Sequence, residues 1–301
     1  MTSPESPVGA INSLTAVIYG PSKAGKTTLA LTAPYPRLVL DVENGTKFAL
    51  INRTYWDPLR AEPPVADGSW DTCIVHCTSF EIMLRTYQWL QSGKHQFSSL
   101  IIDSISELQV KIVEQVAGRS SVQLQQWGDI GRATSGLMRD MRDLTMHPTK
   151  PLQAVILTAM ERENSKDGKK SPYLSGQSAI TLPYLMDVTG YLCIEEYPNP
   201  DPTGPALQFR RLYISSTPRF VAGERVGGRL GTVVEQGDLS VSDMIERIYK
   251  DPFPEPEVVV PDDIPMSDSM LFPAPPPPLE EPLETPPPPA AEPPPPVPAS
   301  A

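Results

Sequence analysis

The sequence predicts an α/β domain with a mostly parallel sheet, followed by a disordered acidic, proline-rich tail. Three observations predict this organisation. Short apolar runs typical of buried strands alternate with segments of helical periodicity, and one such run passes through a glycine-containing loop directly into a helix. At residue 251 the composition changes abruptly. We therefore expect a flexible N-terminus over residues 1–12, one folded domain over 13–250 and a separate tail over 251–301.

The first predicted unit is a strand, a loop and a helix at residues 14–33. Residues 14–19 are apolar and rich in strand formers, and residues 28–33 begin a helix that Pro34 ends. The loop between them has the pattern G-x-x-x-x-G-K-[ST]. This loop and the residue after it are Gly20, Pro21, Ser22, Lys23, Ala24, Gly25, Lys26, Thr27 and Thr28.

Each residue type in this loop has a chemical use. The glycines let backbone N–H groups turn toward phosphate oxygens without a Cβ in the way. Lys26 can reach the β- and γ-phosphates, and the Thr27 hydroxyl can ligate Mg²⁺. The N-terminus of the following helix adds partial positive charge. The segment therefore predicts a nucleoside triphosphate site, and the alternative is a glycine-rich turn that matches by chance.

An acidic residue ends the apolar strand predicted at residues 99–103. Asp103 is its last residue, and Ser104 follows. This is the arrangement of a Walker B acid, which holds the hydration shell of Mg²⁺. The alternative is an acid that caps the next helix.

The strand predicted at residues 37–41 also ends in acid, in the order Asp41-Val42-Glu43. Alternate residues of a strand point the same way, so Asp41 and Glu43 are expected on one face. One of the two carboxylates can then polarise a water that attacks the γ-phosphate. The alternative is a solvated turn formed with Asn44 and Gly45.

The rest of the domain continues the alternation. Helical spacing predicts helices over residues 79–91, 106–116 and 129–146. Apolar runs predict strands over 72–77, 152–158, 188–194 and 207–215. Segments rich in Pro, Gly and Asp predict loops over 52–71 and 196–206.

With these motifs the chain resembles RecA-like P-loop NTPases. More narrowly, it resembles phage nucleotide-binding proteins of the AAA-type set that includes short RecA-like single-strand annealing proteins. The resemblance covers residues 14–220 and rests on the phosphate loop, on residues 40–43 and on residues 100–104. It implies ATP and Mg²⁺ as cofactors, a catalytic role for Lys26, Glu43 as the water-activating residue and Asp103 as the metal-holding acid. It also implies hydrolysis that depends on Mg²⁺ and is stimulated by DNA.

The predicted strand that ends at Thr158 resembles the one that leads into the second DNA-binding loop of RecA-like recombinases. In that family a polar residue at the start of the loop senses the γ-phosphate. Met160 stands at this place, so Thr158, Glu161 or Arg162 would have to substitute.

The loop after this strand is polar and basic. It carries Lys166, Lys169 and Lys170, followed by Tyr173. Lysines can neutralise backbone phosphates, and an aromatic ring can stack on a base. We therefore expect single-stranded DNA to bind here, and a solvated hairpin is the alternative.

A second DNA-facing loop is expected at residues 118–128. Arg119 is a candidate phosphate contact, and Trp127 is a candidate stacking platform that could equally be a core residue docking the next helix. Arg132, Arg139 and Arg142 on that helix can share one face, either toward DNA or as an ordinary solvated face.

RecA-like ATPases complete their active site with a cation from the neighbouring subunit, which in this phage group follows a late strand. Arg219 best matches that arginine, although Thr217 stands where the group commonly has a lysine. A trans-acting cation stabilises charge on the transferred phosphoryl group. The resemblance therefore implies a homo-oligomer, either a filament or a ring, and a surface arginine is the alternative.

The tail accounts for the acidity of the chain. Ten of the 36 acidic residues and no Lys or Arg lie in residues 251–301, which leaves 26 acidic against 25 basic residues in the rest. Twenty of the 37 prolines also lie there, so we expect disorder. Residues 262–265 resemble the acidic tip of bacterial single-strand-binding proteins, which implies a replication or single-strand-binding protein partner. A solubilising spacer and a tail that competes with DNA are the alternatives.

Two functions remain open from the sequence. One is an ATP-hydrolysing phage recombination protein that binds single-stranded DNA and promotes annealing or strand pairing. The other is a nucleotide-gated interaction protein, such as a helicase loader or assembly switch. The start of the chain has no apolar export signal, no run is long enough to span a membrane, and three cysteines suit a reducing compartment. We therefore expect the cytoplasm of a bacterial host and no membrane partner.

Overall fold

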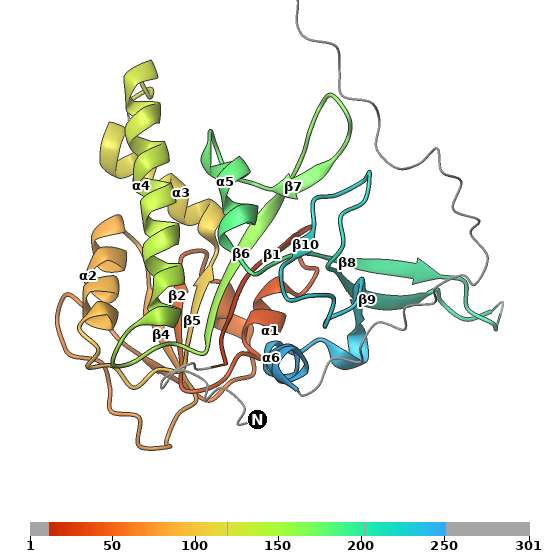
Figure 1. Ribbon diagram of the computed structural model, residues 1–301, viewed down its shortest axis with the longest axis horizontal. Helices are drawn as coiled ribbons and strands as arrows, with labels where there is room; N and C mark the ends of the chain where they lie inside the picture. Colours follow the sequence, from red (N-terminus) through yellow and green to blue (C-terminus); the bar gives the residue numbers. More distant parts are fainter. Residues whose placement is uncertain (1–11, 119, 202, 251–301) are drawn as a thin grey trace, which may run out of the picture. The chain divides into compact units, whose positions relative to one another are not determined.

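A mostly parallel sheet forms the centre of the computed structural model, which describes residues 12–118, 120–201 and 203–250 (Figure 1). Its strands lie in the order β11-β9-β8-β1-β6-β5-β2-β4-β3, with β7 paired to β6 and β10 to β8. The strands are β1 (Leu14–Gly20), β2 (Arg37–Asp41), β3 (Arg53–Tyr55), β4 (Thr72–His76), β5 (Ser99–Asp103), β6 (Ala154–Glu163), β7 (Lys170–Pro172), β8 (Val188–Tyr197), β9 (Leu207–Tyr213), β10 (Gly223–Glu224) and β11 (Val233–Glu235).

The strands from β8 through β1, β6, β5, β2 and β4 to β3 pair in parallel. The additions β9, β11, β10 and β7 are antiparallel. The predicted α/β class with a mostly parallel sheet is therefore confirmed. The expected tail over 251–301 and the expected flexible N-terminus lie outside the described residues, apart from Asn12.

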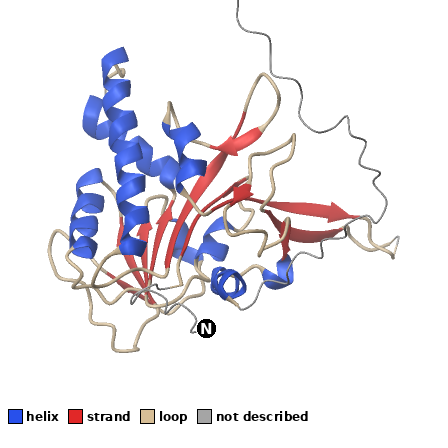
Figure 2. Ribbon diagram, viewed as in Figure 1, coloured by secondary structure: helices blue, strands red, loops and turns tan. Residues whose placement is uncertain are grey.

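Helices cover both faces of the sheet (Figure 2). They are α1 (Lys26–Ala30), α2 (Phe80–Gln91), α3 (Ile105–Ala117), α4 (Leu124–Asp143), α5 (Ser178–Leu185) and α6 (Val241–Tyr249), with short 3₁₀ turns η1 (Gly45–Phe48), η2 (Leu144–Met146) and η3 (Gln236–Asp238). One buried apolar cluster packs α2, α3, α4 and α5 on one face, and a second packs α1 and α6 on the other. Among the described residues, no helix combines the length and apolarity needed to cross a membrane.

Period-two alternation assigns the strand residues to the two faces. In β1, Val17 and Tyr19 belong to the first cluster, and Ala16 and Ile18 to the second. Strand β4 and the residue after it follow the same alternation, with the buried Cys73 and Cys77 on one face and His76 exposed. Burial raises the pKa of both thiols to about 12.

The expected helix over 129–146 has different bounds. Helix α4 already begins at Leu124, so Trp127 lies in the helix and not in a loop. The Gln126 side chain explains the earlier start, because its Oε1 accepts from the Gln123 N–H at 2.8 Å and thereby caps the first turn. The helical spacing placed the start after Gly128, which the helix in fact contains.

Two strand predictions also need correction. Strand β6 continues past Thr158 to Glu163, because β7 pairs with its far end in a hairpin. The segment 52–71, predicted as a loop, contains β3, which pairs with β4 at the sheet edge. Its Arg53 guanidinium donates to the carbonyls of Thr46, at 2.9 Å, and of Ala49, and so ties β3 to η1. The β3–β4 pairing spans the long loop between the two strands, so local sequence does not reveal it.

Candidate active site

The predicted nucleotide-binding residues meet at the carboxyl ends of four neighbouring strands. Strands β1, β6, β5 and β2 are adjacent and parallel, so their carboxyl ends share one edge, the usual ligand-binding edge of such sheets. A cavity of about 560 Å³ opens there, within the range that holds a small ligand. It is lined by Gly20, Pro21, Ser22, Lys23, Gly25, Lys26, Thr27, Thr28, Glu43, Asp103, Ser104, Thr158, Met160, Glu161 and Arg210.

Glycines shape the loop between β1 and α1. A Cβ on Gly20 would lie 2.0 Å from the carbonyl oxygen of Leu192 in the neighbouring strand β8, so this position admits glycine alone. Gly25 precedes the helix with φ 101°, a conformation that side chains other than glycine rarely adopt. The loop therefore turns tightly from strand to helix with its backbone toward the cavity.

Lys26 lies across the mouth of this loop. Its ammonium donates to the carbonyl oxygens of Gly20 at 2.9 Å and Pro21 at 2.8 Å. Burial lowers the pKa of Lys26 below its ordinary value, and the carboxylates of Glu43 and Asp103 oppose that shift. Because its hydrogen-bond partners are neutral carbonyls, this half-buried cation can attract a phosphate strongly.

Asp103 and two threonines form an oxygen-only cluster beside Lys26. The Thr27 hydroxyl donates to one Asp103 carboxylate oxygen at 2.8 Å, and the Thr158 hydroxyl donates to the other. Burial raises the pKa of Asp103, while the two hydroxyl donors oppose the rise. Gly45 faces the cluster, and a Cβ there would lie 2.9 Å from Asp103 Oδ2. Carboxylate and hydroxyl oxygens beside open space fit Mg²⁺, which Thr27 and Asp103 would hold.

The two acids after β2 have different surroundings. Asp41 is buried and accepts from the N–H groups of Gly45 at 3.0 Å and Thr46 at 3.1 Å, and from the Thr46 hydroxyl. It therefore holds the turn η1. Glu43 is exposed, lines the cavity and accepts a hydrogen bond from the Ser104 hydroxyl. Of the two carboxylates, Asp41 is bound by the turn, and Glu43 is the one that lines the cavity.

The model of a family described as AAA domain matches residues 12–226. The chain belongs to the AAA domain family. A comparison with curated proteins gives no match. Among solved structures, the chain is similar to one titled as a prototypical ATPase from the type III secretion system of pathogenic bacteria, with 14% identity, a TM-score of 0.38 and coverage of 60% of this chain and 52% of that chain. The chain thus spans about half the length of that ATPase.

The family and the phosphate loop together make this AAA domain a P-loop NTPase, which supports nucleotide binding and hydrolysis at the cavity. The structure brings together all the cavity residues that the sequence predicts, apart from Ala24, which is buried behind the loop. Gly45 and Arg210 are the site residues that sequence reasoning missed. Gly45 could have been found as a glycine two residues after the predicted catalytic acid Glu43, but nothing local distinguishes Arg210 from Arg211.

Strand β6 of the AAA domain carries Met160 and all three residues proposed to substitute for it as the γ-phosphate sensor. Thr158 is bonded to Asp103, and Met160 and Glu161 line the cavity, whereas Arg162 is exposed and does not. The Glu161 carboxylate accepts from the Tyr191 hydroxyl at 3.1 Å and pairs with the Lys170 ammonium at 3.4 Å.

The predicted DNA-binding residues do not line the nucleotide cavity, and one of them lies outside the described residues. Lys166 is exposed and Lys169 half-exposed on the β6–β7 hairpin, whereas the ammonium of Lys170 is taken up by Glu161 and Tyr191. Trp127 is 42% exposed on α4. Arg119 lies outside the described residues.

Arg219 of the AAA domain is exposed and does not line its own chain's cavity. Its carbonyl oxygen accepts from the Lys170 N–H at 2.8 Å, which joins the segment after β9 to the hairpin. Among the helix arginines, Arg132 pairs with Asp129 and Arg142 with Asp143. Such pairs are what the alternative, an ordinary solvated helix face, predicts.

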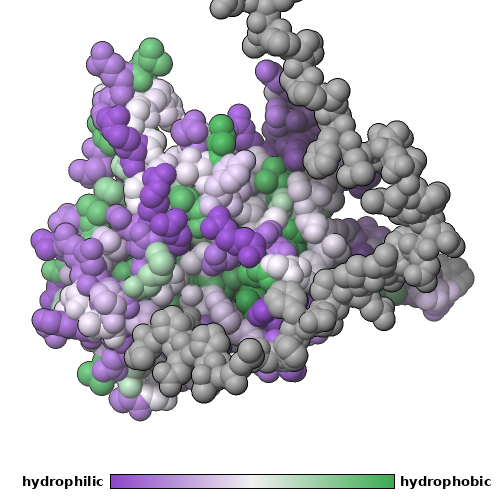
Figure 3. Space-filling model, in the orientation of Figure 1, coloured by the Kyte–Doolittle hydropathy of each residue, from purple (hydrophilic) through white to green (hydrophobic). Residues whose placement is uncertain are grey.

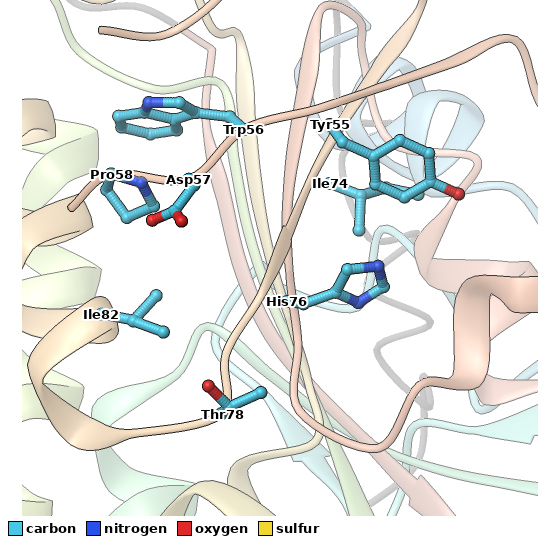
Figure 4. Close-up of a pocket in the computed structure, with 8 residues that line it drawn as sticks. All are labelled: Tyr55, Trp56, Asp57, Pro58, Ile74, His76, Thr78 and Ile82. Atoms are coloured by element: carbon cyan, nitrogen blue, oxygen red, sulfur yellow. The ribbon is translucent and has the colours of Figure 1, made fainter. Parts of the chain in front are cut away.

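A second cavity of about 600 Å³ lies at the sheet edge of β3 and β4 (Figure 4). The rings of Tyr55 and His76 stack on one side of it, with centroids 5.4 Å apart, and Trp56, Pro58 and Ile82 lie on the other. None of the residues predicted for the nucleotide or DNA sites lines this cavity.

Proposed function

We propose that this AAA domain binds and hydrolyses ATP with Mg²⁺, binds single-stranded DNA, and promotes annealing or strand pairing in phage recombination as a filament or ring. The observation that carries the proposal is the path of β6. The strand passes Thr158, Met160 and Glu161 at the nucleotide cavity and continues directly into the basic β6–β7 hairpin. A ligand on the hairpin and a nucleotide in the cavity therefore act on one rigid element.

Side-chain contacts support coupling along this path. Lys170 at the start of β7 pairs with Glu161 in the cavity wall. Its hydrogen bond to the Tyr191 hydroxyl, and to a smaller extent this pairing, raises the pKa of Lys170. The Ser106 hydroxyl accepts from the Met160 N–H at 3.0 Å and donates to the Tyr173 carbonyl at 2.8 Å. A shift of β6 on nucleotide binding would therefore be passed to both arms of the hairpin.

The outer part of the hairpin has the chemistry for a nucleic-acid backbone. Lys166 and Lys169 form no ion pair with any described residue, and Tyr173 is 44% exposed. Mobile ammonium groups can neutralise phosphates, and the Tyr173 ring offers a face for a base. Figure 3 shows hydrophilic surface over the projecting hairpin, whereas the projecting end of α4 carries both hydrophilic and hydrophobic residues. We propose Lys166 and Lys169 as the first phosphate contacts and Trp127 on α4 as a further stacking platform.

Single-strand binding is expected to weaken with salt, and less steeply when the hairpin lysines are neutralised. For single strands each neutralised phosphate contributes about −0.7 to the slope of log affinity against log salt. Lys166→Gln with Lys169→Gln should therefore flatten the slope by roughly 1.4. The measurement is fluorescence anisotropy of a labelled oligonucleotide with a non-hydrolysable ATP analogue at several salt concentrations.

The matched control replaces Lys94 and Lys150 with glutamine. Both are exposed and precede β5 and β6, at the opposite edge of the sheet, so the slope should not change. A hairpin variant with the wild-type slope would remove these lysines from the contact. If the wild-type protein has no single-strand affinity at low salt, the proposal fails in favour of the nucleotide-gated interaction protein.

A further inference from the structure

Arg210 of β9 extends into the nucleotide cavity of its own chain. Strands β8 and β9 pair antiparallel, with Ile194 opposite Arg210. Two residues along β9 on the same face, Leu212 is fully buried against the cluster that contains α1. Arg210 therefore continues this face beyond the core, where the sheet meets the phosphate loop, and lines the cavity.

The Arg210 side chain lies directly against the phosphate loop. A Cβ built on Gly25 would be 3.2 Å from Arg210 Nε and 3.5 Å from its Cδ. The absence of a side chain at Gly25 thus leaves the space through which the arginine crosses the loop. Gly25 immediately precedes Lys26, so two cations flank the place where phosphates are expected.

The guanidinium of Arg210 forms no hydrogen bond or ion pair with any described residue, although its backbone N–H donates to the Gln236 side chain at 3.0 Å. The next residue is a sharp contrast. Arg211 points to the other face and pairs with Glu195 at 2.9 Å and Glu235 at 3.1 Å. Of two adjacent arginines, one is therefore satisfied by protein carboxylates, and the other is left with its donors free in an anion-binding cavity.

The chemistry of the cavity indicates what Arg210 binds. Its carboxylates, Glu43, Asp103 and Glu161, have hydroxyl or ammonium partners of their own. Guanidinium donors are arranged to bind phosphate oxygens in pairs, and this recognition is lost on replacement by lysine. We infer that Arg210 binds the phosphate chain of the nucleotide held by its own subunit, a role distinct from the trans role proposed for Arg219. The inference rests on the proposed ATP binding.

Arg210→Ala is expected to weaken ATP binding by about 10- to 100-fold, the range for loss of charge-assisted hydrogen bonds. AMP, which lacks the outer phosphates, should lose much less affinity. Arg210→Lys should recover part of the loss, because it keeps the charge without the fork. Titration of each variant with ATP, ADP and AMP gives these values, and circular dichroism confirms folding. If Arg210→Ala unfolds, Arg210→Gln replaces it, since glutamine keeps most of the stem.

Two results separate this inference from the proposed function. If wild-type protein does not bind ATP, the proposed function fails. If wild-type protein binds ATP and folded Arg210→Ala or Arg210→Gln binds it equally well, only the role of Arg210 is overturned.

Mixing inactive variants tests whether the arginine acts within its own subunit. When Arg210→Ala is mixed with Lys26→Ala, a cis residue leaves every site defective, so ATP turnover should not recover. Recovery would mean that Arg210 reaches a neighbour's nucleotide, and the cis assignment would be wrong. The same mixture made with Arg219→Ala is the control, because a trans residue supplied by the Lys26→Ala subunit restores some sites.

Discussion

Replacement of Lys26 by alanine is expected to abolish ATP turnover and to weaken ATP binding by at least about tenfold, since hydrogen bonds to charged groups contribute about 1.5–3 kcal/mol. The ammonium lies in the cavity, and its only hydrogen-bond partners among the described residues are two loop carbonyls. Its side chain faces the cavity and not the apolar core, so the fold should persist. Calorimetric titration with ATP and a phosphate-release assay measure the two effects.

The control for this variant is Lys94→Ala, which removes an exposed lysine remote from the cavity. It should bind and hydrolyse ATP as the wild-type protein does. Thermal melting followed by circular dichroism shows whether both variants fold. A folded Lys26→Ala protein with unchanged affinity and turnover would show that the phosphate loop is not the nucleotide site.

Glu43→Gln is expected to bind ATP normally and to hydrolyse it about 10²- to 10⁴-fold more slowly, the scale of general-base effects. A glutamine carbonyl can still accept the Ser104 hydrogen bond that the carboxylate accepts, so the side chain should keep its place. Only its ability to take a proton from water is lost. Single-turnover hydrolysis at saturating ATP, measured beside the binding constant, separates the two properties.

Asp41→Asn is the matched comparison for Glu43→Gln. Asp41 accepts three hydrogen bonds that hold η1. Its replacement should therefore lower the melting temperature and leave the hydrolysis rate of the folded protein nearly unchanged. If the opposite pattern is found, with normal turnover in Glu43→Gln and lost turnover in folded Asp41→Asn, the water-activating role belongs to Asp41.

Local sequence was sufficient to predict the phosphate-binding part of the cavity. The phosphate loop, Thr27 and Asp103 follow strands whose apolar runs are unmistakable, and parallel pairing then brings strand ends to one edge without further information. The strand predicted over 72–77 is present, and its alternation separates the buried Cys73 from the exposed His76. These predictions succeed because each depends on a period of two and on the residue types at a strand end.

The errors arise where the partner of a side chain depends on how the chain turns or on which strands pair. Asp41 ends strand β2, and Glu43 lies two residues further on. The N–H groups of Gly45 and Thr46 bind the Asp41 carboxylate, whereas the Ser104 hydroxyl binds Glu43. Lys170 looks like a free loop lysine until the hairpin brings it to Glu161. Arg210 reaches the phosphate loop only because β9 pairs with β8, which itself pairs with β1. Ser104 and Arg210 lie far along the chain from Glu43 and the phosphate loop, and the nearer partners of Asp41 and Lys170 are set by a turn and a hairpin, which the residue types alone do not specify.

The most direct test of the proposed function is the rate of ATP hydrolysis with Mg²⁺ in the presence and absence of single-stranded DNA. The path from the cavity along β6 to the hairpin predicts a measurable basal rate that rises when single-stranded DNA is added. Glu43→Gln should show neither the basal rate nor the rise. A wild-type rate that stays the same at saturating single-stranded DNA would contradict the proposed coupling of this P-loop ATPase to DNA.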